Sequence, residues 1–269
     1  MKKLLKGEAL MLRTCRPDGI SYNDFKWPKS GPVKCKDWEP TPQCGNGLHG
    51  LLWGEGDGSL LNWSEDAAWL VVRVKESQVI SIGGDKVKVP AGVVEFFGDA
   101  KAAVELIQKY APAGACVVSG TATAGVSGTA TAGYSGTATA GVSGTATAGD
   151  SGTATAGYRG TATAGYRGTA TAGDSGTATA GYSGTATAGD SGTATAGVRG
   201  TATAGDSGTA TAGYSGTATA GMDGVISIMY WNGEKYKRAI FVVGENGIEP
   251  NQPYQVDSAG KPIKVERKP

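Results

Sequence analysis

The chain has 269 residues and a formal net charge of +1, and more than half of its 45 glycines fall between residues 120 and 223. Proteins that bind a phosphate backbone usually carry an excess of positive charge, which this balanced composition lacks, so we expect no nucleic-acid partner. No stretch approaches the roughly 20 apolar residues of a membrane-spanning helix, so we expect no membrane partner.

The first residues resemble an export signal only briefly. Residues 1–5 combine lysines with leucines, but Lys6, Glu8 and Arg13 interrupt the sequence before an apolar stretch forms. In a chain without an export signal, the four cysteines are expected to be reduced thiols rather than a disulfide framework. We therefore expect a cytoplasmic protein.

Residues 1–115 are predicted to form a small α+β domain. Five of the six tryptophans precede residue 70, which places an aromatic core in this region. Strands are predicted over residues 69–74, 78–82 and 92–97. The proline, glycine and cysteine content between residues 28 and 61 predicts long loops.

The single histidine, His49, raises the question of a metal site. Together with three cysteines it offers a Cys₃His set, which zinc accepts, but the 19, 8 and 4 intervening residues match no standard zinc motif. Two interpretations stay open: a zinc site, or buried thiols with a core or loop histidine and no cofactor. The residues concerned are Cys15, Cys35, Cys44 and His49.

One motif in this region also resembles part of an enzyme. Gly47–Leu48–His49, followed by Trp-Ser-x-Asp-Ala and a valine-rich strand, resembles the core of ADP-ribosyltransferases. That resemblance implies a tyrosine that grips a dinucleotide and a carboxylate, for which Glu95 is the candidate. Neither a nucleophile triad nor a phosphate-binding loop is visible, so we expect a protein that is not an enzyme and keep the transferase as the third alternative.

Residues 100–110 predict a short amphipathic helix, and residues 116–118 lead from it toward the next region. That region, residues 116–223, is predicted to be a β-solenoid. A solenoid exposes strand edges and apolar core at its ends unless another segment covers them. We therefore expect residues 100–118 to cap the N-terminal end of the solenoid.

The octad Gly-Thr-Ala-Thr-Ala-Gly-x-x occurs thirteen times without a slip between Gly120 and Asp223. A fixed short period indicates a solenoid. Thr-Ala-Thr-Ala alternates with period two and predicts a strand with alanines inside and threonines outside. Because eight residues are too few for a closed coil, we expect two octads in each 16-residue coil and a rod of roughly 30 Å. The two octad glycines are expected to give the bends their unusual dihedrals and to allow close approach.

Outward threonines about 6.7 Å apart on one strand, repeated about 4.8 Å away on the next coil, would form a flat lattice of hydroxyl and methyl groups. Such a lattice can order water. Two arrays are expected, one on each face, because consecutive octads alternate between faces. The predicted ligand surface comprises Thr121, Thr123, Thr129, Thr131, Thr145, Thr147, Thr161, Thr163, Thr177, Thr179, Thr193 and Thr195.

The seventh octad position predicts a second surface. A 16-residue coil places every second octad in one column, and one column holds four tyrosines that are expected to stack and to form a homodimer interface. These are Tyr134, Tyr166, Tyr182 and Tyr214.

Residues 224–269 are predicted to form a C-terminal β cap and a tail. The apolar run at residues 225–231, the turn Asn232–Gly233 and residues 236–243 predict a β-hairpin. The whole chain is therefore expected to be mainly β.

In another frame the octad is Ala-Gly-Tyr-Ser-Gly-Thr-Ala-Thr, as in residues 132–139, and this resembles the repeat of bacterial ice-nucleation proteins. That family's unit differs between its halves and its arrays are longer. The regions outside the repeat resemble an uncharacterised group of bacterial and phage proteins with a Cys-Gly-Asn-Gly-Leu-His motif, which names no activity. The resemblance favours ice or ordered water as the ligand; the alternative is a structural or protein-interaction rod, which the phage resemblance would suit.

Overall fold

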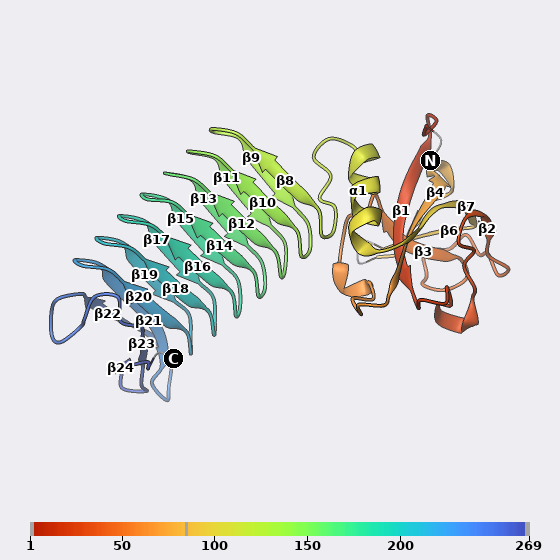
Figure 1. The fold of residues 1–269 in the computed structure, drawn as a ribbon. Coiled ribbons are helices and arrows are strands. Elements are labelled where there is room, and N and C mark those ends of the chain that lie inside the picture. The colour runs from red at the N-terminus through yellow and green to blue at the C-terminus, as the bar shows by residue number, and fades with distance from the viewer. Residues whose placement is uncertain (1–2, 84–85, 267–269) are drawn as a thin grey trace. The chain divides into compact units, whose positions relative to one another are not determined.

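The structure is a computed structural model that describes residues 3–83 and 86–266. The chain divides into two compact units, Met1–Gly120 and Thr121–Pro269 (Figure 1). Each unit has its own hydrophobic core. Within the described ranges, no helix combines the length and the apolar character that a membrane span requires.

The N-terminal unit contains one seven-stranded antiparallel sheet with the strand order β2-β7-β4-β1-β3-β6-β5. The described part of this unit also has one α-helix, which fits the α+β prediction. Its elements are β1 (Glu8–Cys15), β2 (Gly31–Lys34), β3 (Leu48–Leu52), β4 (Ala68–Lys75), β5 (Ile80–Ser81), β6 (Val87–Val89), β7 (Ala91–Gly98), α1 (Ala100–Tyr110) and the 3₁₀ helices Tyr22–Asp24, Gly58–Leu60 and Glu76–Gln78.

β1 and β4 lie at the centre of this sheet because both carry continuous apolar runs. Leu10 and Leu70 are fully buried, as is Val71, which pairs with Leu12 across the two strands. A strand covered on both faces needs such a run rather than alternation. α1 packs on β1, β4 and β7 through Ala103, Val104 and Ile107.

The predicted strands at residues 69–74 and 92–97 and the helix at residues 100–110 are confirmed as β4, β7 and α1. The strand predicted over residues 78–82 was too long, because a 3₁₀ helix takes its start and only Ile80–Ser81 pairs. β1 was not predicted, because charged residues flank its apolar run and weaken the sequence signal. The long loops predicted between residues 28 and 61 are only partly confirmed, because β2 and β3 lie within this range.

Residues 116–118 bond to the N-terminal unit rather than leading directly into a coil. The Val118 amide donates to the Gly54 carbonyl at 2.8 Å, and the Cys116 amide donates to the Glu55 carboxylate at 2.7 Å. Val117 forms a β-bridge with Glu55. The capping role of residues 100–118 stays a prediction.

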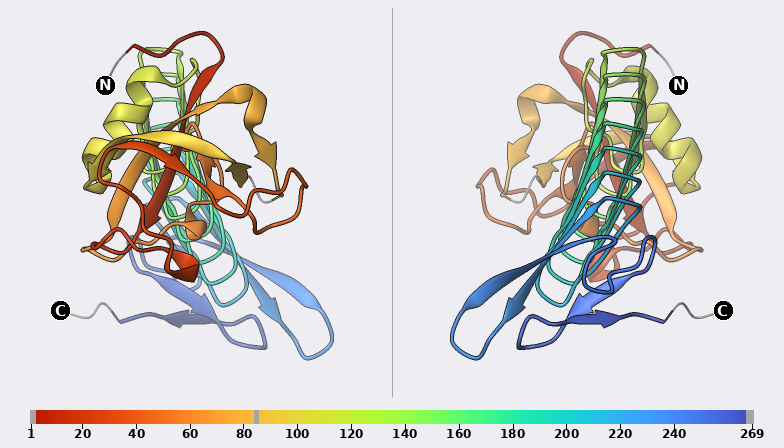
Figure 2. Two further views of the ribbon diagram at one scale, coloured as in Figure 1. Left: turned by 90° about the vertical axis from the view of Figure 1, so that its right-hand side faces the viewer. Right: turned by 90° about the vertical axis from the view of Figure 1, so that its left-hand side faces the viewer.

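The octads form a β-solenoid with two parallel sheets, and one strand comes from each octad (Figures 1 and 2). From β8 (Thr121–Ala124) to β19 (Thr209–Ala212), each strand pairs in parallel with the strand that lies 16 residues later, so the two-octad coil is confirmed. The β8 sheet contains β8 (Thr121–Ala124), β10 (Thr137–Ala140), β12 (Thr153–Ala156), β14 (Thr169–Ala172), β16 (Thr185–Ala188), β18 (Thr201–Ala204) and β20 (Thr217–Ala220). The β9 sheet contains β9 (Thr129–Ala132), β11 (Thr145–Ala148), β13 (Thr161–Ala164), β15 (Thr177–Ala180), β17 (Thr193–Ala196) and β19 (Thr209–Ala212).

The core of the solenoid consists of alanine methyl groups, as predicted. All repeat alanines from Ala130 to Ala220 are buried, whereas Ala122 and Ala124 on the first strand are half-buried. A buried methyl contributes only about 0.8 kcal/mol, so this narrow core depends on the uninterrupted backbone ladder beside it.

The turns differ from the prediction. The unusual backbone conformation was expected at the octad glycines, but another residue of each octad adopts it. Positive φ falls on the eighth octad residue, with 56° at Ser127 and 54° at Arg159, and on no octad glycine. The glycines are required instead for close approach. A Cβ on Gly144 would lie 2.8 Å from the Cβ of Ala140 and 2.9 Å from the carbonyl oxygen of Gly128 in the preceding coil.

The predicted C-terminal hairpin is confirmed as β21 (Val225–Trp231) and β22 (Tyr236–Val242). β21 extends the β9 sheet, and Ile226 and Ile228 fill the end of the core in place of alanines. A second hairpin was not predicted, since this segment was expected to be a tail. It consists of β23 (Tyr254–Val256) and β24 (Pro262–Lys264) and extends the β8 sheet through β20 (Figure 2).

Candidate functional site

The solenoid presents two flat threonine lattices, one on each sheet. In the β9 sheet, Thr145 pairs with Thr161 and Thr161 with Thr177, without a register shift. The β8 sheet has the same register. Strands about 4.8 Å apart and threonines about 6.7 Å apart along each strand therefore define a two-dimensional grid on both faces.

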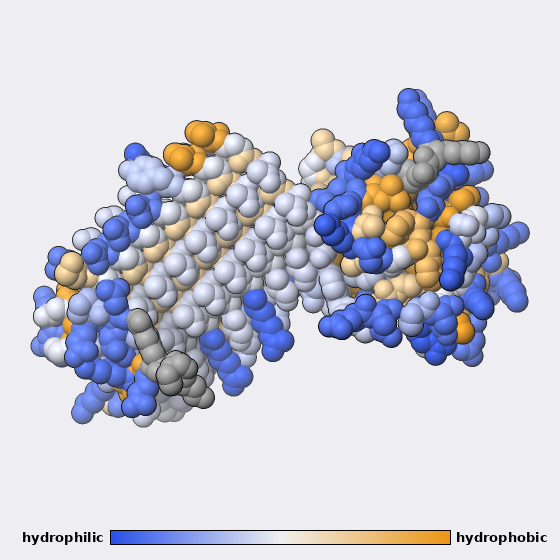
Figure 3. All heavy atoms as spheres, in the orientation of Figure 1, coloured by the Kyte–Doolittle hydropathy of each residue, from blue (hydrophilic) through white to orange (hydrophobic). Residues whose placement is uncertain are grey.

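The two threonines of a strand differ in exposure. In β12 to β18 the first threonine is exposed and the second is half-buried, while both alanines are buried. Figure 3 shows the visible face of the solenoid as straight parallel rows of pale residues, neither strongly hydrophilic nor strongly hydrophobic. Each lattice point thus offers a hydroxyl and a methyl group on a stiff, β-branched side chain.

The predicted ligand surface mixes residues from both lattices. Thr121 and Thr123 belong to β8, whereas the other ten threonines of the set belong to β9, β11, β13, β15 and β17. The set therefore has to be divided, because the odd and even octads lie in different sheets. The ten residues of the β9 sheet form one continuous lattice.

The two lattices differ in what their last threonines contact at the C-terminal end of the solenoid. On the β8 sheet the Gln255 amide donates to the hydroxyl of Thr217 at 3.0 Å, and Thr219 is only 7% exposed. On the β9 sheet, Thr209 and Thr211 pair with Val225 and Ser227 of β21. The second hairpin thus contacts a threonine of β20 in the β8 sheet, whereas the threonine rows of the β9 sheet continue as Val225 and Ser227 of β21.

The turns form two columns along the edges of the solenoid. In the predicted tyrosine column, the rings of Tyr166 and Tyr182 stack with their centroids 5.5 Å apart. Asp150 separates Tyr134 from this pair and Val198 separates Tyr214 from it, so the column contains one stacked pair rather than one continuous stack. Tyr214 packs edge-to-face against Tyr236 of β22.

Aspartates in the turns bind the backbone of the next coil. Oδ1 of Asp174 accepts a hydrogen bond from the amide of Asp190, whose Oδ1 accepts one from Asp206, whose Oδ1 in turn accepts one from Met222. On the other edge, Asp150 accepts from the Tyr166 amide at 2.7 Å. This aspartate ladder was not predicted, although the 16-residue spacing of Asp174, Asp190 and Asp206 is visible in the sequence.

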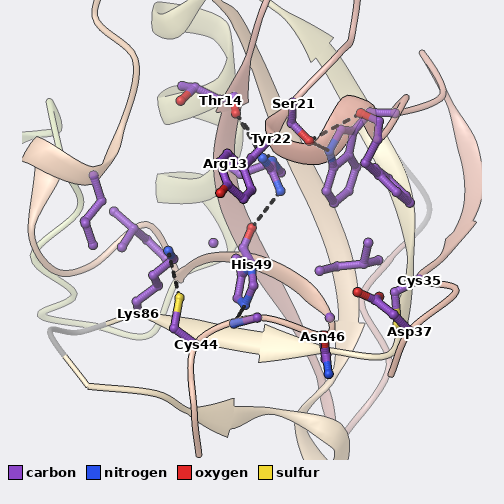
Figure 4. A pocket seen from close by; sticks show the side chains of 18 of the residues that line it. Arg13, Thr14, Ser21, Tyr22, Cys35, Asp37, Cys44, Asn46, His49 and Lys86 are labelled. Carbon is purple, nitrogen blue, oxygen red and sulfur yellow. Dashed lines mark hydrogen bonds between the residues drawn. The ribbon is translucent and has the colours of Figure 1, made fainter. Parts of the chain in front are cut away.

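The four candidate zinc ligands lie in the N-terminal unit. Cys35, Cys44 and His49 line one pocket, and Cys15 does not (Figure 4). Within the described part of the chain, no three His, Cys, Asp or Glu side chains gather around a possible metal position. Burial raises the pKa of the Cys15 and Cys35 thiols, and the Cys35 thiol donates to the Pro90 carbonyl at 3.2 Å. The structure therefore does not assemble the Cys₃His set.

The candidate transferase carboxylate, Glu95, is an ion-pair partner of Arg73. The Arg73 guanidinium lies 2.7 Å from Glu95 and 3.1 Å from Glu8. Glu95 does not line the pocket that holds His49. The two parts of the transferase resemblance are therefore not brought together.

Comparison with known proteins concerns only part of the chain. No family model matches the chain, and no solved structure matches it. An ice nucleation protein of Xanthomonas campestris pv. translucens is 36% identical over 106 residues, which are 39% of this chain and 7% of that protein. Ice nucleation protein InaU of Pantoea ananas is 37% identical over 101 residues, or 37% of this chain and 10% of that protein.

An ice nucleation protein of Pseudomonas syringae is 39% identical over 93 residues, which are 34% of this chain and 8% of that protein. The chain thus matches no more than a tenth of the length of these curated relatives. The matched segments have about the length of the octad array. The β-solenoid repeat of this chain is therefore similar to the repeats of proteins named ice nucleation proteins.

Proposed function

We propose that the solenoid binds ice or ordered water through its threonine lattices. The observation that carries this proposal is the unshifted pairing of threonine with threonine along both sheets. The similarity to proteins named ice nucleation proteins supports the same ligand. A structural or protein-interaction rod is the alternative.

The physical basis is preorganisation. Immobilising one water molecule at a hydroxyl costs up to about 2 kcal/mol of free energy through lost entropy. Because the grid is already rigid, the protein itself loses no further conformational entropy when many waters bind. The methyl groups between the hydroxyls leave apolar surface over which bound water forms hydrogen bonds mainly to other water. A lattice of roughly 30 Å is small, so we expect binding to existing ice to exceed nucleation of new ice.

The proposal includes a homodimer through the tyrosine column. Tyr166 is 44% exposed and Tyr182 is 41% exposed, and their stacked rings form a flat aromatic surface that a second copy can cover. Light scattering at high micromolar concentration should show a dimer for the parent. The double variant Tyr166→Ser, Tyr182→Ser should be monomeric, whereas Tyr158→Ser on the other edge should not change the mass. A parent that is monomeric would refute the dimer.

Ice recrystallisation and droplet-freezing measurements on the full chain test the ligand. We expect slower recrystallisation than in buffer with an inert protein of the same concentration, and a smaller effect on the freezing temperature of droplets. Recrystallisation at the rate of the inert control would contradict ice binding and favour the interaction rod.

A further inference from the structure

The N-terminal unit contains a pocket of about 490 Å³ beside β1 and β3 (Figure 4). Small-molecule sites usually have volumes of roughly 300–1,000 Å³. Its apolar wall includes Phe25, Leu48, Leu60 and Leu61. The charged residues that line it are the bases Arg13, Lys36 and Lys86 and one acid, the exposed Asp37.

Arg13 is the central feature of this pocket. Its Nη1 donates to the His49 carbonyl at 3.2 Å, and its Nε and Nη2 donate to the Thr14 carbonyl at 3.4 and 3.3 Å. The guanidinium lies 4.3 Å from the centroid of the Trp27 ring. Among the residues that the structure describes, no carboxylate forms an ion pair with Arg13.

Arg73 on the neighbouring strand β4 differs from Arg13 in its partners. Arg73 has two carboxylate partners, Glu8 and Glu95, in the same sheet. A largely buried cation is normally paired in this way, because burying a charge without an anion costs several kcal/mol of solvation free energy. Burial lowers the pKa of Arg13 to about 10, so it remains charged at neutral pH. Its positive charge is therefore available to an anion inside the pocket.

Lys86 and His49 also line this pocket. Lys86 is half-buried, and its Nζ donates to the Cys44 sulfur at 3.9 Å. Burial lowers the pKa of His49 to about 4, with further contributions from the charges of Lys86, Arg13 and Lys88. His49 is therefore neutral at neutral pH, and its Nε2 accepts a hydrogen bond from the Gly45 amide at 3.4 Å.

We propose that this pocket binds a small organic phosphate, the size of a nucleoside monophosphate, in which a flat ring carries the phosphate group. The phosphate binds to the Arg13 guanidinium and the Lys86 ammonium, which together match a doubly charged group. The ring packs on the apolar wall beside Phe25, under Tyr22, whose side chain lies at the rim and is 89% exposed. This site is independent of the threonine lattices.

The proposal is tested by NMR titration of the full chain with adenosine monophosphate, adenosine and inorganic phosphate. The readouts are the Arg13 side-chain Nε–H and the Trp27 indole N–H, which donates to the Ser21 hydroxyl at 3.2 Å. Adenosine monophosphate should shift both signals saturably at millimolar concentration or below. Adenosine and inorganic phosphate should each bind about tenfold or more weakly, because each lacks one half of the interactions.

Lys86→Met should weaken binding of adenosine monophosphate about ten- to hundredfold, because it removes one charged hydrogen-bond donor. Lys101→Met, which removes an exposed charge on α1, is the matched control and should bind as the parent does. If Arg13→Met does not fold, Arg13→Lys is the second variant. Arg13→Lys keeps the positive charge but should still weaken binding, because lysine lacks the planar guanidinium fork. Absence of any shift with adenosine monophosphate at 10 mM, about the weakest binding expected of a built site, would overturn the proposal. Parent-like affinity in folded Lys86→Met would do the same.

Discussion

A Cβ on Gly181 would lie 2.8 Å from both the carbonyl carbon and the carbonyl oxygen of Gly165 in the preceding coil. The same close approach recurs along the solenoid, since a Cβ on Gly157 would lie 3.0 Å from the carbonyl carbon of Gly141. These distances involve backbone atoms that cannot move aside without separating two coils. The octad glycines therefore set the stacking of the coils, and the eighth residue sets the direction of each turn.

The variant Gly181→Ala should lower the free energy of unfolding of the solenoid by about 1–3 kcal/mol, the usual cost of atoms forced into a packed site. Denaturant unfolding followed by circular dichroism measures the change. Thr185→Ala, at an exposed position of the same coil region, should have much less effect. A midpoint for Gly181→Ala equal to that of the control would show that the coils are not packed this closely.

The variant Ala146→Leu should also destabilise the solenoid, by about 1–3 kcal/mol, because Ala146 is fully buried in the narrow methyl core. Thr147→Leu adds a comparable side chain on the outer face of the same strand and should cost less. Thermal melting of both proteins compares the two faces directly. A parent-like melting temperature for Ala146→Leu would refute the inward orientation of this alanine.

The variant Asp190→Ala should weaken the aspartate ladder, since Asp190 accepts the Asp206 amide at 2.9 Å. A hydrogen bond of this kind contributes about 1 kcal/mol, so the loss of stability should be small. Hydrogen exchange is the more sensitive measurement, and the Asp206 amide should exchange faster. Asp190→Asn retains an acceptor oxygen and should keep most of the protection. Unchanged exchange in Asp190→Ala would mean that the carboxylate does not protect this amide.

His49 should titrate with a midpoint of about 4 instead of its ordinary value of 6.5, because burial and neighbouring cations disfavour its charged form. As pH falls from about 6.5 to about 4, the unfolded chain takes up a proton that the folded chain does not, so stability falls in this window. His49 is the only histidine, so its NMR signal needs no assignment by mutation. A midpoint near 6.5 would show an exposed imidazole. In His49→Gln, this part of the pH dependence should be absent.

The solenoid was predictable because its fold depends on local repetition. An alternation of period two and a fixed octad determine the strand, its inward face and the two-octad coil, since each coil contacts only its neighbours. The turn conformation was not predictable by the same route. Glycine permits positive φ, but Ser127 and its equivalents adopt it here, because stacking reserves the glycine positions for close backbone approach.

The N-terminal unit was less predictable because its strands pair out of sequence order. β1 lies between β3 and β4, and β7 returns to pair with both β2 and β4. Long-range pairing of this kind leaves no periodic signal in the sequence. The contact of Arg13 with Trp27 and His49 depends on it, so the pocket could not be found from residue spacing.

The most direct test of the threonine lattices substitutes each face separately with tyrosine at four central positions and measures ice recrystallisation. The β9-sheet set is Thr161, Thr163, Thr177 and Thr179, and the β8-sheet set is Thr169, Thr171, Thr185 and Thr187. Both variants should keep the parent's circular dichroism spectrum, because these side chains point outward. We expect at least one set to abolish the effect on ice. Full activity in both folded variants, or no activity in the parent, would contradict ice binding by the threonine lattices.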